Sequence, residues 1–95
     1  MINIDGLILK IITPNKIIYQ GEVRYIKART TVGDVGILSN HVPYIGLINN
    51  SVVVIKDLNK NKKQFICQNG IIKVKNNIAL IAAQTATSEQ LIKNI

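Results

Sequence analysis

Hydrophobic residues along the chain occur in nine short runs that are rich in β-branched side chains. The runs span Leu7–Ile12, Ile17–Tyr19, Val23–Ala28, Val35–Leu38, Tyr44–Ile48, Val52–Ile55, Phe65–Cys67, Ile71–Val74 and Ile78–Ala82. Segments rich in Asn, Gly, Pro and Asp separate them, and no helical period appears before residue 86. Short strands at such regular spacing predict an all-β fold, either a β-sandwich or a flattened barrel.

Three of the separating segments predict particular connections. Asn76-Asn77 predicts a two-residue hairpin turn, because such turns need positive φ angles and Asn tolerates them better than any residue except Gly. Asn69-Gly70 is compatible with a turn or with a β-bulge. The polar segment Asp57–Lys63 predicts a longer hairpin tip whose lysines face solvent.

Two runs depart from the alternation of a simple half-buried strand. Val23, Ile26 and Ala28 can all point inward only if one extra residue is accommodated at Arg24-Tyr25, which predicts a β-bulge. The run Val52–Ile55 shows no alternation at all. We therefore expect some strands to be covered on both faces, in part by another protein.

The end of the chain has a different character. Thr87-Ser88-Glu89 is followed by apolar residues, which is typical of a helix N-terminus. Only about two helical turns fit before Ile95, and so short a helix is marginal without docking. We expect one β domain over residues 1–86 and a short helical or disordered tail over residues 87–95.

The size and charge of the chain limit its organisation and its partners. A chain of 95 residues is one domain, and its formal net charge of +7 is compatible with nucleic acid, a membrane surface or an acidic protein. No charged residue occurs in Val35–Ile55, but its glycines, asparagines and proline argue against a membrane span. The N-terminus, with Asp5 and a short apolar run, does not resemble a signal peptide.

The residues that usually perform chemistry are few and scattered. One Cys and one His exclude a structural zinc site and a disulfide framework, and the five acids form no recognisable pair. Gly33-Asp34-Val35-Gly36 lacks the Lys-Ser/Thr of a phosphate-binding loop. We expect no catalytic site, no metal and no cofactor, with His41 in a structural or interface role and Cys67 as a buried apolar residue.

A small basic RNA-binding β-barrel is the alternative that the charge suggests. Such proteins stack bases on aromatic side chains that gather on one strand face. Aromatic residues make up only 4% of this chain and do not cluster; they are Tyr19, Tyr25, Tyr44 and Phe65. Solvated surface lysines explain the charge more simply.

Four segments together resemble one family. Gly33–Pro43 is similar to the glycine- and histidine-containing signature of the epsilon subunit of rotary F-type ATP synthases. Three further segments resemble other parts of that subunit and follow the same order along the chain; they are Leu9–Pro14, Ile18–Val23 and Asn69–Val74. The resemblance extends over about residues 4–86. It implies a β-sandwich of roughly ten strands and a non-catalytic subunit of the central stalk.

The resemblance also implies partners and site residues. The subunit would bind the gamma subunit and the c-ring, and so lie at the periphery of the energy-transducing membrane, on its cytoplasmic side or in the equivalent organelle compartment. Residues that match the c-ring loop are Thr31, Val32, Gly33 and Asp34, and residues that match the gamma-facing side are Thr13, His41 and Gly46. Asp34 would pair with an arginine of the c-ring.

The chain departs from the family pattern in a few places. Asn40 and Asn69 stand where Gly is common, and both tolerate a left-handed backbone. Ser39 and Ser51 also replace the usual residues, and Val32 is often acidic in relatives. The residues after Thr87 are too few for the helical hairpin that the family usually has, so we expect no inhibition of ATP hydrolysis through a C-terminal arm.

Overall fold

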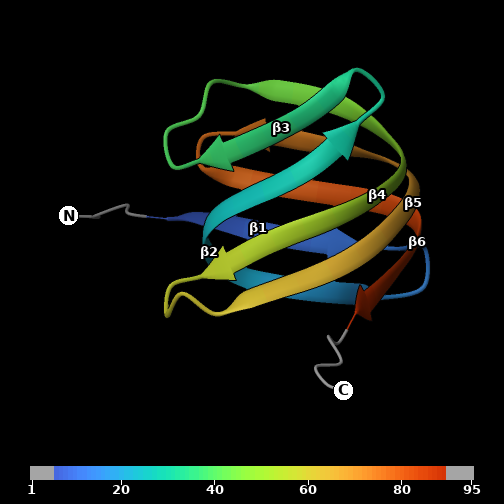
Figure 1. Ribbon diagram of the computed structural model, residues 1–95, viewed down its shortest axis with the longest axis horizontal. Coiled ribbons are helices and arrows are strands. Elements are labelled where there is room, and N and C mark those ends of the chain that lie inside the picture. The colour runs from blue at the N-terminus through green and yellow to red at the C-terminus, as the bar shows by residue number, and fades with distance from the viewer. Residues whose placement is uncertain (1–5, 90–95) are drawn as a thin grey trace.

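The computed structural model describes residues 6–89, which form six β-strands. The strands are β1 (Leu7–Ile12), β2 (Ile17–Thr30), β3 (Gly33–Leu38), β4 (Tyr44–Asp57), β5 (Lys62–Lys75) and β6 (Ile78–Glu89). Figure 1 shows how they wrap around one interior. No helix long and apolar enough to span a membrane lies within residues 6–89.

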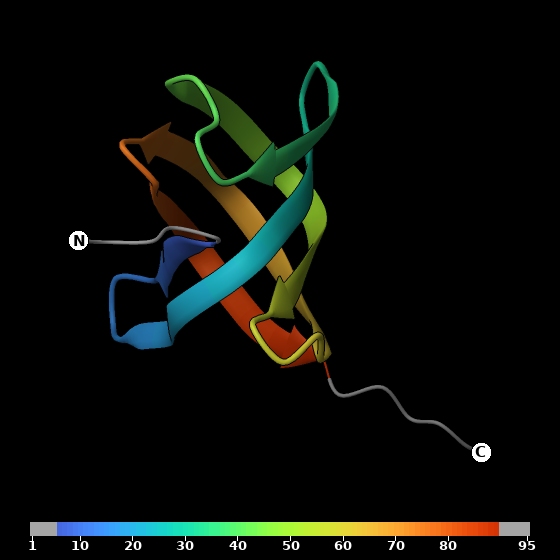
Figure 2. The ribbon, with the colours of Figure 1, turned by 90° about the vertical axis from the view of Figure 1, so that its left-hand side faces the viewer.

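The strands form one continuous sheet in the order β1-β6-β5-β4-β2-β3, and β1 also pairs with β2. This second pairing of β1 closes the sheet, because β1 lies parallel to β6 on one side and antiparallel to β2 on the other. Strand β3 pairs with β2 alone and extends the sheet as a hairpin, visible at the top of Figure 2. The predicted all-β fold is confirmed.

The nine predicted runs become six strands because three of the predicted breaks lie inside strands. Gln20-Gly21 lies within β2, Asn49-Asn50 within β4 and Asn69-Gly70 within β5. At all three places the strand keeps its pairing with a neighbour, and at Asn49-Asn50 and Asn69-Gly70 it also bends around the core. Counting β2, β4, β5 and β6 on both sides of their bends gives ten segments, in agreement with the family resemblance.

Burial along the long strands reveals where they bend. In β4 the buried positions are Gly46 and Ile48 before the bend, and Ser51 and Val53 after it. Two successive residues, Asn49-Asn50, face outward between them, so the alternation changes phase. Strands β5 and β6 change phase in the same way at Gln68-Asn69 and Gln84-Thr85. The strands therefore bend side by side.

Polar side chains bridge the outside of this shared bend. The register aligns Asn50 with Gln68 and Gln68 with Thr85. The Gln68 amide donates to the Asn50 side chain at 3.5 Å, and the Thr85 hydroxyl donates to the Gln68 Oε1 at 2.8 Å. Asn69 donates to Gln84 Oε1 at 3.2 Å. These bonds join three strands at their shared bend.

Asn69 and Gly70 make the bend in β5 sterically possible. Asn69 has a φ of 54°, in the left-handed region that Asn tolerates. The register is continuous across both neighbouring strands, so Asn69-Gly70 is neither a hairpin turn nor a bulge with an extra residue. A Cβ on Gly70 would overlap the carbonyl oxygen of Ala82 and lie 2.7 Å from the Cα of Ala83. Only glycine allows β6 to pass this close.

The predicted hairpin and bulge are both confirmed. Asn76 and Asn77 have φ angles of 54° and 62° and connect β5 to β6 directly. The pairing of β2 with β4 shifts by one residue between Val23 and Tyr25. This shift leaves Val23, Ile26 and Ala28 all buried, as the extra residue requires.

The β4–β5 connection is also the predicted hairpin tip. Its backbone is organised by Asp57, whose Oδ1 accepts the backbone N–H groups of Asn59 and Asn61, both at 2.9 Å. The bond from Asn61 is the largest of the effects that lower the pKa of Asp57 below its usual value. The ionised Asp57 carboxylate therefore stabilises the folded conformation of the tip. This contribution to stability is lost when the pH falls and the carboxylate is protonated.

Buried apolar side chains from all six strands form one core. Its largest aliphatic members are Leu7, Leu9, Ile11, Ile26, Ile37, Ile48, Ile55, Ile72 and Ile81. Cys67 is fully buried among them, which confirms its interpretation as an apolar residue. Burial raises the pKa of its thiol to about 11.

The predicted helix start at Thr87 is wrong as far as the structure describes the tail. Thr87, Ser88 and Glu89 continue β6 and pair with Ile66, Phe65 and Gln64 of β5. Inter-strand hydrogen bonds outweigh a local capping signal because they satisfy the same backbone groups without a helix nucleus. The remainder of the predicted tail lies outside the described residues.

Gly70→Ala is expected to lower the free energy of unfolding by about 2 kcal/mol or more, because the new methyl group collides with β6. Urea denaturation of both proteins measures this change. The matched control is Gly36→Ala, since a Cβ on Gly36 has no neighbour within 4 Å. Equal stability of the two variants would contradict the close approach at Gly70.

Cys67 is expected to resist thiol reagents in the native protein at about pH 8, because its thiolate is unavailable. Ellman's reagent should react with it only after denaturation. As a control, Val32→Cys in a Cys67→Ala background should react at once, because Val32 is 89% exposed. Rapid labelling of native Cys67 would contradict the burial.

Candidate docking surfaces

The outer surface of β4, β5, β6 and β1 exposes many apolar side chains on one side of the bend. Among them, Ile45 is 66% exposed, Leu47 58% and Ile78 54%. We call this surface the apolar face. Its members are Ile8, Ile12, Ile45, Leu47, Ile71, Ile78, Leu80 and Ala82.

The sheet register brings these side chains together from distant parts of the chain. In one row, Leu47 of β4 lies opposite Ile71 of β5, which lies opposite Ala82 of β6 and then Ile12 of β1. In another row, Ile78 lies opposite Ile8. Contiguous exposed apolar area of this kind is typical of a protein-binding surface.

Cations are interspersed with the apolar side chains. Lys73 and Leu80 are opposite each other in the register, as are Leu80 and Lys10. Lys75 is exposed at the hairpin end of the face. The acid nearest in register is Glu22, which pairs with Ile8 at the edge formed by β2. A partner with apolar and acidic side chains would complement this surface.

The predicted gamma-facing residues lie around the apolar face and do not form one cluster. Thr13 follows Ile12 in the turn at one end of β1. His41 lies toward the other end of that strand, in a loop where the Asn40 backbone N–H donates to the Asn77 side chain at 2.6 Å.

Gly46 occupies a different position from the other two. It lies on β4 between the exposed side chains of Ile45 and Leu47 but faces inward. A Cβ there would lie 2.6 Å from the Tyr44 hydroxyl oxygen and 3.0 Å from Thr30 Cγ2. Gly46 therefore makes room within the fold and offers no side chain to a partner.

His41 has local partners that account for its side chain. Its Nδ1 lies 2.7 Å from the Val42 carbonyl oxygen, and its ring packs edge-on against Tyr44 at 6.0 Å between centroids. Within residues 6–89, no three His, Cys, Asp or Glu side chains gather where they could hold a metal ion. The geometry around His41 suits a structural or interface residue.

The predicted c-ring residues form the exposed tip of the β2–β3 hairpin. The Thr30 hydroxyl donates to the Gly33 carbonyl oxygen at 2.8 Å and accepts the Val32 N–H at 3.2 Å. Thr31 N–H donates to the Leu47 carbonyl oxygen at 2.9 Å, which ties the tip to β4. Gly33 has a φ of 128°, so its backbone requires glycine. Thr31, Val32 and Gly33 thus form a short, internally braced projection (Figure 2).

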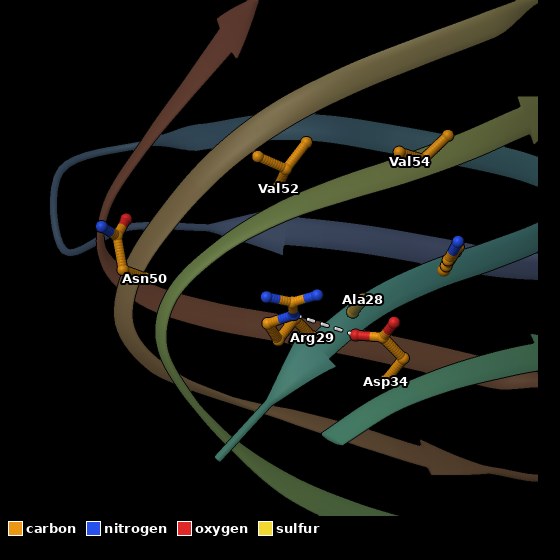
Figure 3. A pocket seen from close by; sticks show the side chains of 7 residues that line it. Ala28, Arg29, Asp34, Asn50, Val52 and Val54 are labelled. Carbon is orange, nitrogen blue, oxygen red and sulfur yellow. Dashed lines mark hydrogen bonds and ion pairs between the residues drawn. The ribbon is translucent and has the colours of Figure 1, made fainter. Parts of the chain in front are cut away.

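Asp34, which the sequence suggested as a partner for an external arginine, already has one in this chain. Its Oδ1 lies 3.0 Å from Arg29 Nε, on the adjacent strand of the same hairpin (Figure 3). Both side chains are largely exposed, at 72% for Arg29 and 51% for Asp34. Such a surface pair contributes only about 0–1 kcal/mol, so an external cation can compete for Asp34.

The sequence analysis did not identify the apolar face. Adjacent apolar residues such as Ile11-Ile12 and Ile71-Ile72 could have indicated strands with apolar side chains on both sides. Which outward side chains meet depends on the pairing of four strands, and the pattern within one strand does not contain that information.

Comparisons with known proteins agree with this architecture. Residues 7–89 match the profile of the family "ATP synthase, Delta/Epsilon chain, beta-sandwich domain". The chain is 32% identical over 85 residues to the chloroplastic ATP synthase epsilon chain of Bigelowiella natans, covering 88% of this chain and 62% of that one. It is 38% identical over 79 residues to the ATP synthase epsilon chain of Clostridium novyi, covering 82% and 60%.

Two solved assemblies contain chains with the same fold. A chain in the OSCP/F1/c-ring structure of Euglena gracilis mitochondrial ATP synthase superposes with a TM-score of 0.83 at 21% identity, covering 88% of this chain and 54% of that one. A chain in the central stalk and c-ring structure of the Tetrahymena thermophila mitochondrial enzyme gives a TM-score of 0.64 at 15% identity, covering 83% and 63%.

The chain spans only 60–62% of the length of these two epsilon-chain relatives. The family match nevertheless includes all six strands, the apolar face and the hairpin tip. This chain therefore belongs to the β-sandwich domain family of ATP synthase delta/epsilon chains.

Proposed function

We propose that this chain is a non-catalytic rotor subunit of an F-type ATP synthase, which joins the gamma subunit to the c-ring in the central stalk. In this position it couples ion flow to rotation and ATP synthesis. It is a peripheral part of the membrane complex, on the cytoplasmic side or in the equivalent organelle compartment. It uses no cofactor and no small-molecule ligand.

The apolar face is the observation that supports this function best. A subunit that transmits torque must stay bound to its partner during rotation. Burial of a broad apolar surface provides such a contact, and salt does not weaken it as it weakens contacts between charges. We assign the apolar face to the gamma subunit, because Thr13, His41 and Gly46 lie around it or within it. The tip formed by Thr31, Val32, Gly33 and Asp34 projects from a separate edge and is assigned to the c-ring.

RNA binding has no comparable support. Tyr19 packs against buried Phe65 with 5.5 Å between ring centroids, and Tyr25 and Tyr44 are half-buried. The four aromatic side chains of the chain therefore do not form a stacking platform. The large exposed apolar side chains of the described residues are aliphatic, which suits a protein partner.

Leu47→Glu is expected to reduce recovery of the gamma subunit at least about tenfold, because it places a charge within an apolar contact. The tagged protein is recovered from its own detergent-solubilised membranes, washed at high salt, and bound proteins are identified by mass spectrometry. Leu58→Glu is the matched control, since Leu58 is 42% exposed but lies on the β4–β5 tip.

The unsubstituted protein should recover gamma together with the alpha, beta and c subunits. Recovery of salt-sensitive RNA in place of these subunits would reject the rotor function in favour of nucleic-acid binding. Equal recovery of gamma by the Leu47→Glu and Leu58→Glu variants would reject the apolar face as the gamma site.

Asp34→Lys is expected to impair coupling between proton pumping and ATP hydrolysis while the domain stays folded, because Asp34 is exposed and contributes little to stability. Proton pumping and ATPase activity are measured in membranes that contain the variant. Glu89→Lys makes the same charge change at an exposed position on β6. Normal pumping and synthesis by the Asp34→Lys complex would remove Asp34 from the c-ring contact.

A further inference from the structure

A hollow of about 390 Å³ opens on the outer surface where β2 and β4 separate. Their backbone pairing ends at Lys27 and Val54. Beyond that point the Arg29 backbone N–H donates to the Ser51 hydroxyl at 2.9 Å, so a side chain replaces the missing ladder partner. Ser51 is only 2% exposed, so this bond between β2 and β4 is shielded from solvent.

The lining of the hollow combines cations with an apolar wall. Lys27 and Arg29 extend from β2, and Val52 and Val54 from β4. Asn50 lies at one end and supplies a side-chain amide (Figure 3). This composition suits a ligand that has both an anionic head and an aliphatic portion.

Arg29 still has hydrogen-bonding capacity toward the hollow. It binds Asp34 through Nε at 3.0 Å. In Figure 3 the dashed line to Asp34 starts at Nε and not at either terminal nitrogen. A guanidinium group has five N–H donors, so the terminal nitrogens can bind a second carboxylate while Nε keeps the first. The ion pair with Asp34 favours this orientation of the guanidinium.

The charge of the hollow favours a singly charged ligand. Lys27 and Arg29 supply two positive charges, and Asp34 supplies one negative charge. One carboxylate neutralises the remaining charge. A doubly charged phosphate monoester would leave an excess negative charge beside Asp34, which opposes its binding.

We propose that this hollow binds the carboxylate of an acidic side chain from a partner protein, with the methylene groups of that side chain against Val52 and Val54. Because the hollow is adjacent to the tip at Asp34, the inference rests on the proposed function and specifies it further. The partner segment that contacts the tip has an acidic side chain for Arg29 and Lys27, as well as a basic one for Asp34.

A protein carboxylate fits this site better than a membrane surface does. Anionic membranes bind clusters of free surface cations over a broad area. Here two cations lie in a recess beside an apolar wall, and one of them is already oriented by Asp34. Such a geometry selects one anionic group with an aliphatic stem.

The test is a titration of the full chain with the capped tripeptide acetyl-Gly-Glu-Gly-amide, followed by NMR at constant ionic strength. We expect saturable shifts of the Arg29 Nε–H signal and of the Val52 and Val54 methyl signals. Acetyl-Gly-Gln-Gly-amide, which lacks the charge, should produce no saturable shift. Dimethyl phosphate, a singly charged phosphodiester, represents the membrane lipid headgroup.

Arg29→Gln should weaken binding of the Glu peptide at least about tenfold, because it removes a charged hydrogen-bonding group. Lys10→Gln makes the same charge change on the apolar face and should leave binding unchanged. Absence of saturation with the Glu peptide, or equal binding by the two variants, would overturn the proposal. Tighter binding of dimethyl phosphate than of the peptide would overturn it in favour of lipid.

Failure of this proposal is distinguishable from failure of the rotor function. The Arg29→Gln protein should still recover the gamma subunit in the high-salt pull-down, because the hollow is on the other side of the bend from the apolar face. Loss of gamma by this variant would show that Arg29 acts in a different contact and would contradict the assignment of the hollow.

Discussion

The bend shared by β4, β5 and β6 is the feature on which the rest of this structure depends. Six strands enclose one core only because the long strands curve around it without losing their pairing. Two successive outward residues change the phase of each strand at the bend, and side-chain hydrogen bonds among Asn50, Gln68 and Thr85 join the strands there. Gly70 supplies the close approach that no larger residue permits.

Because the sheet bends, it presents two outer surfaces of different chemistry. On one side of the bend, the apolar face combines aliphatic side chains with lysines and has its cations dispersed. On the other side, β2 and β4 separate and leave a hollow in which cations and valines are close together. The first surface suits a large, lasting contact, and the second suits one specific anionic group.

The hairpin between β2 and β3 carries the tip that we assign to the c-ring. Its tip is braced by the Thr30 hydroxyl and by a backbone bond to β4, so its shape does not depend on a partner. Arg29 partly neutralises Asp34 within the free chain. The hairpin therefore places one cation beside one anion, which favours a partner with the complementary pair of charges and disfavours one with a single sign of charge.

The sequence by itself determined the all-β class of the fold, the bulge at Arg24-Tyr25, the hairpin turn at Asn76-Asn77 and the burial of Cys67. Each of these depends on neighbours in the chain, through side-chain alternation or the backbone preference of one residue. The four family-like segments also pointed to the family to which the chain belongs.

Only the tertiary structure decided what depends on the pairing of distant strands. Asn69-Gly70 proved to be a bend because β4 and β6 continue their ladders past it. Thr87 remained in a strand because β5 offered backbone partners. The apolar face and the Arg29–Asp34 pair likewise arise from register, which brings together side chains that no local pattern relates.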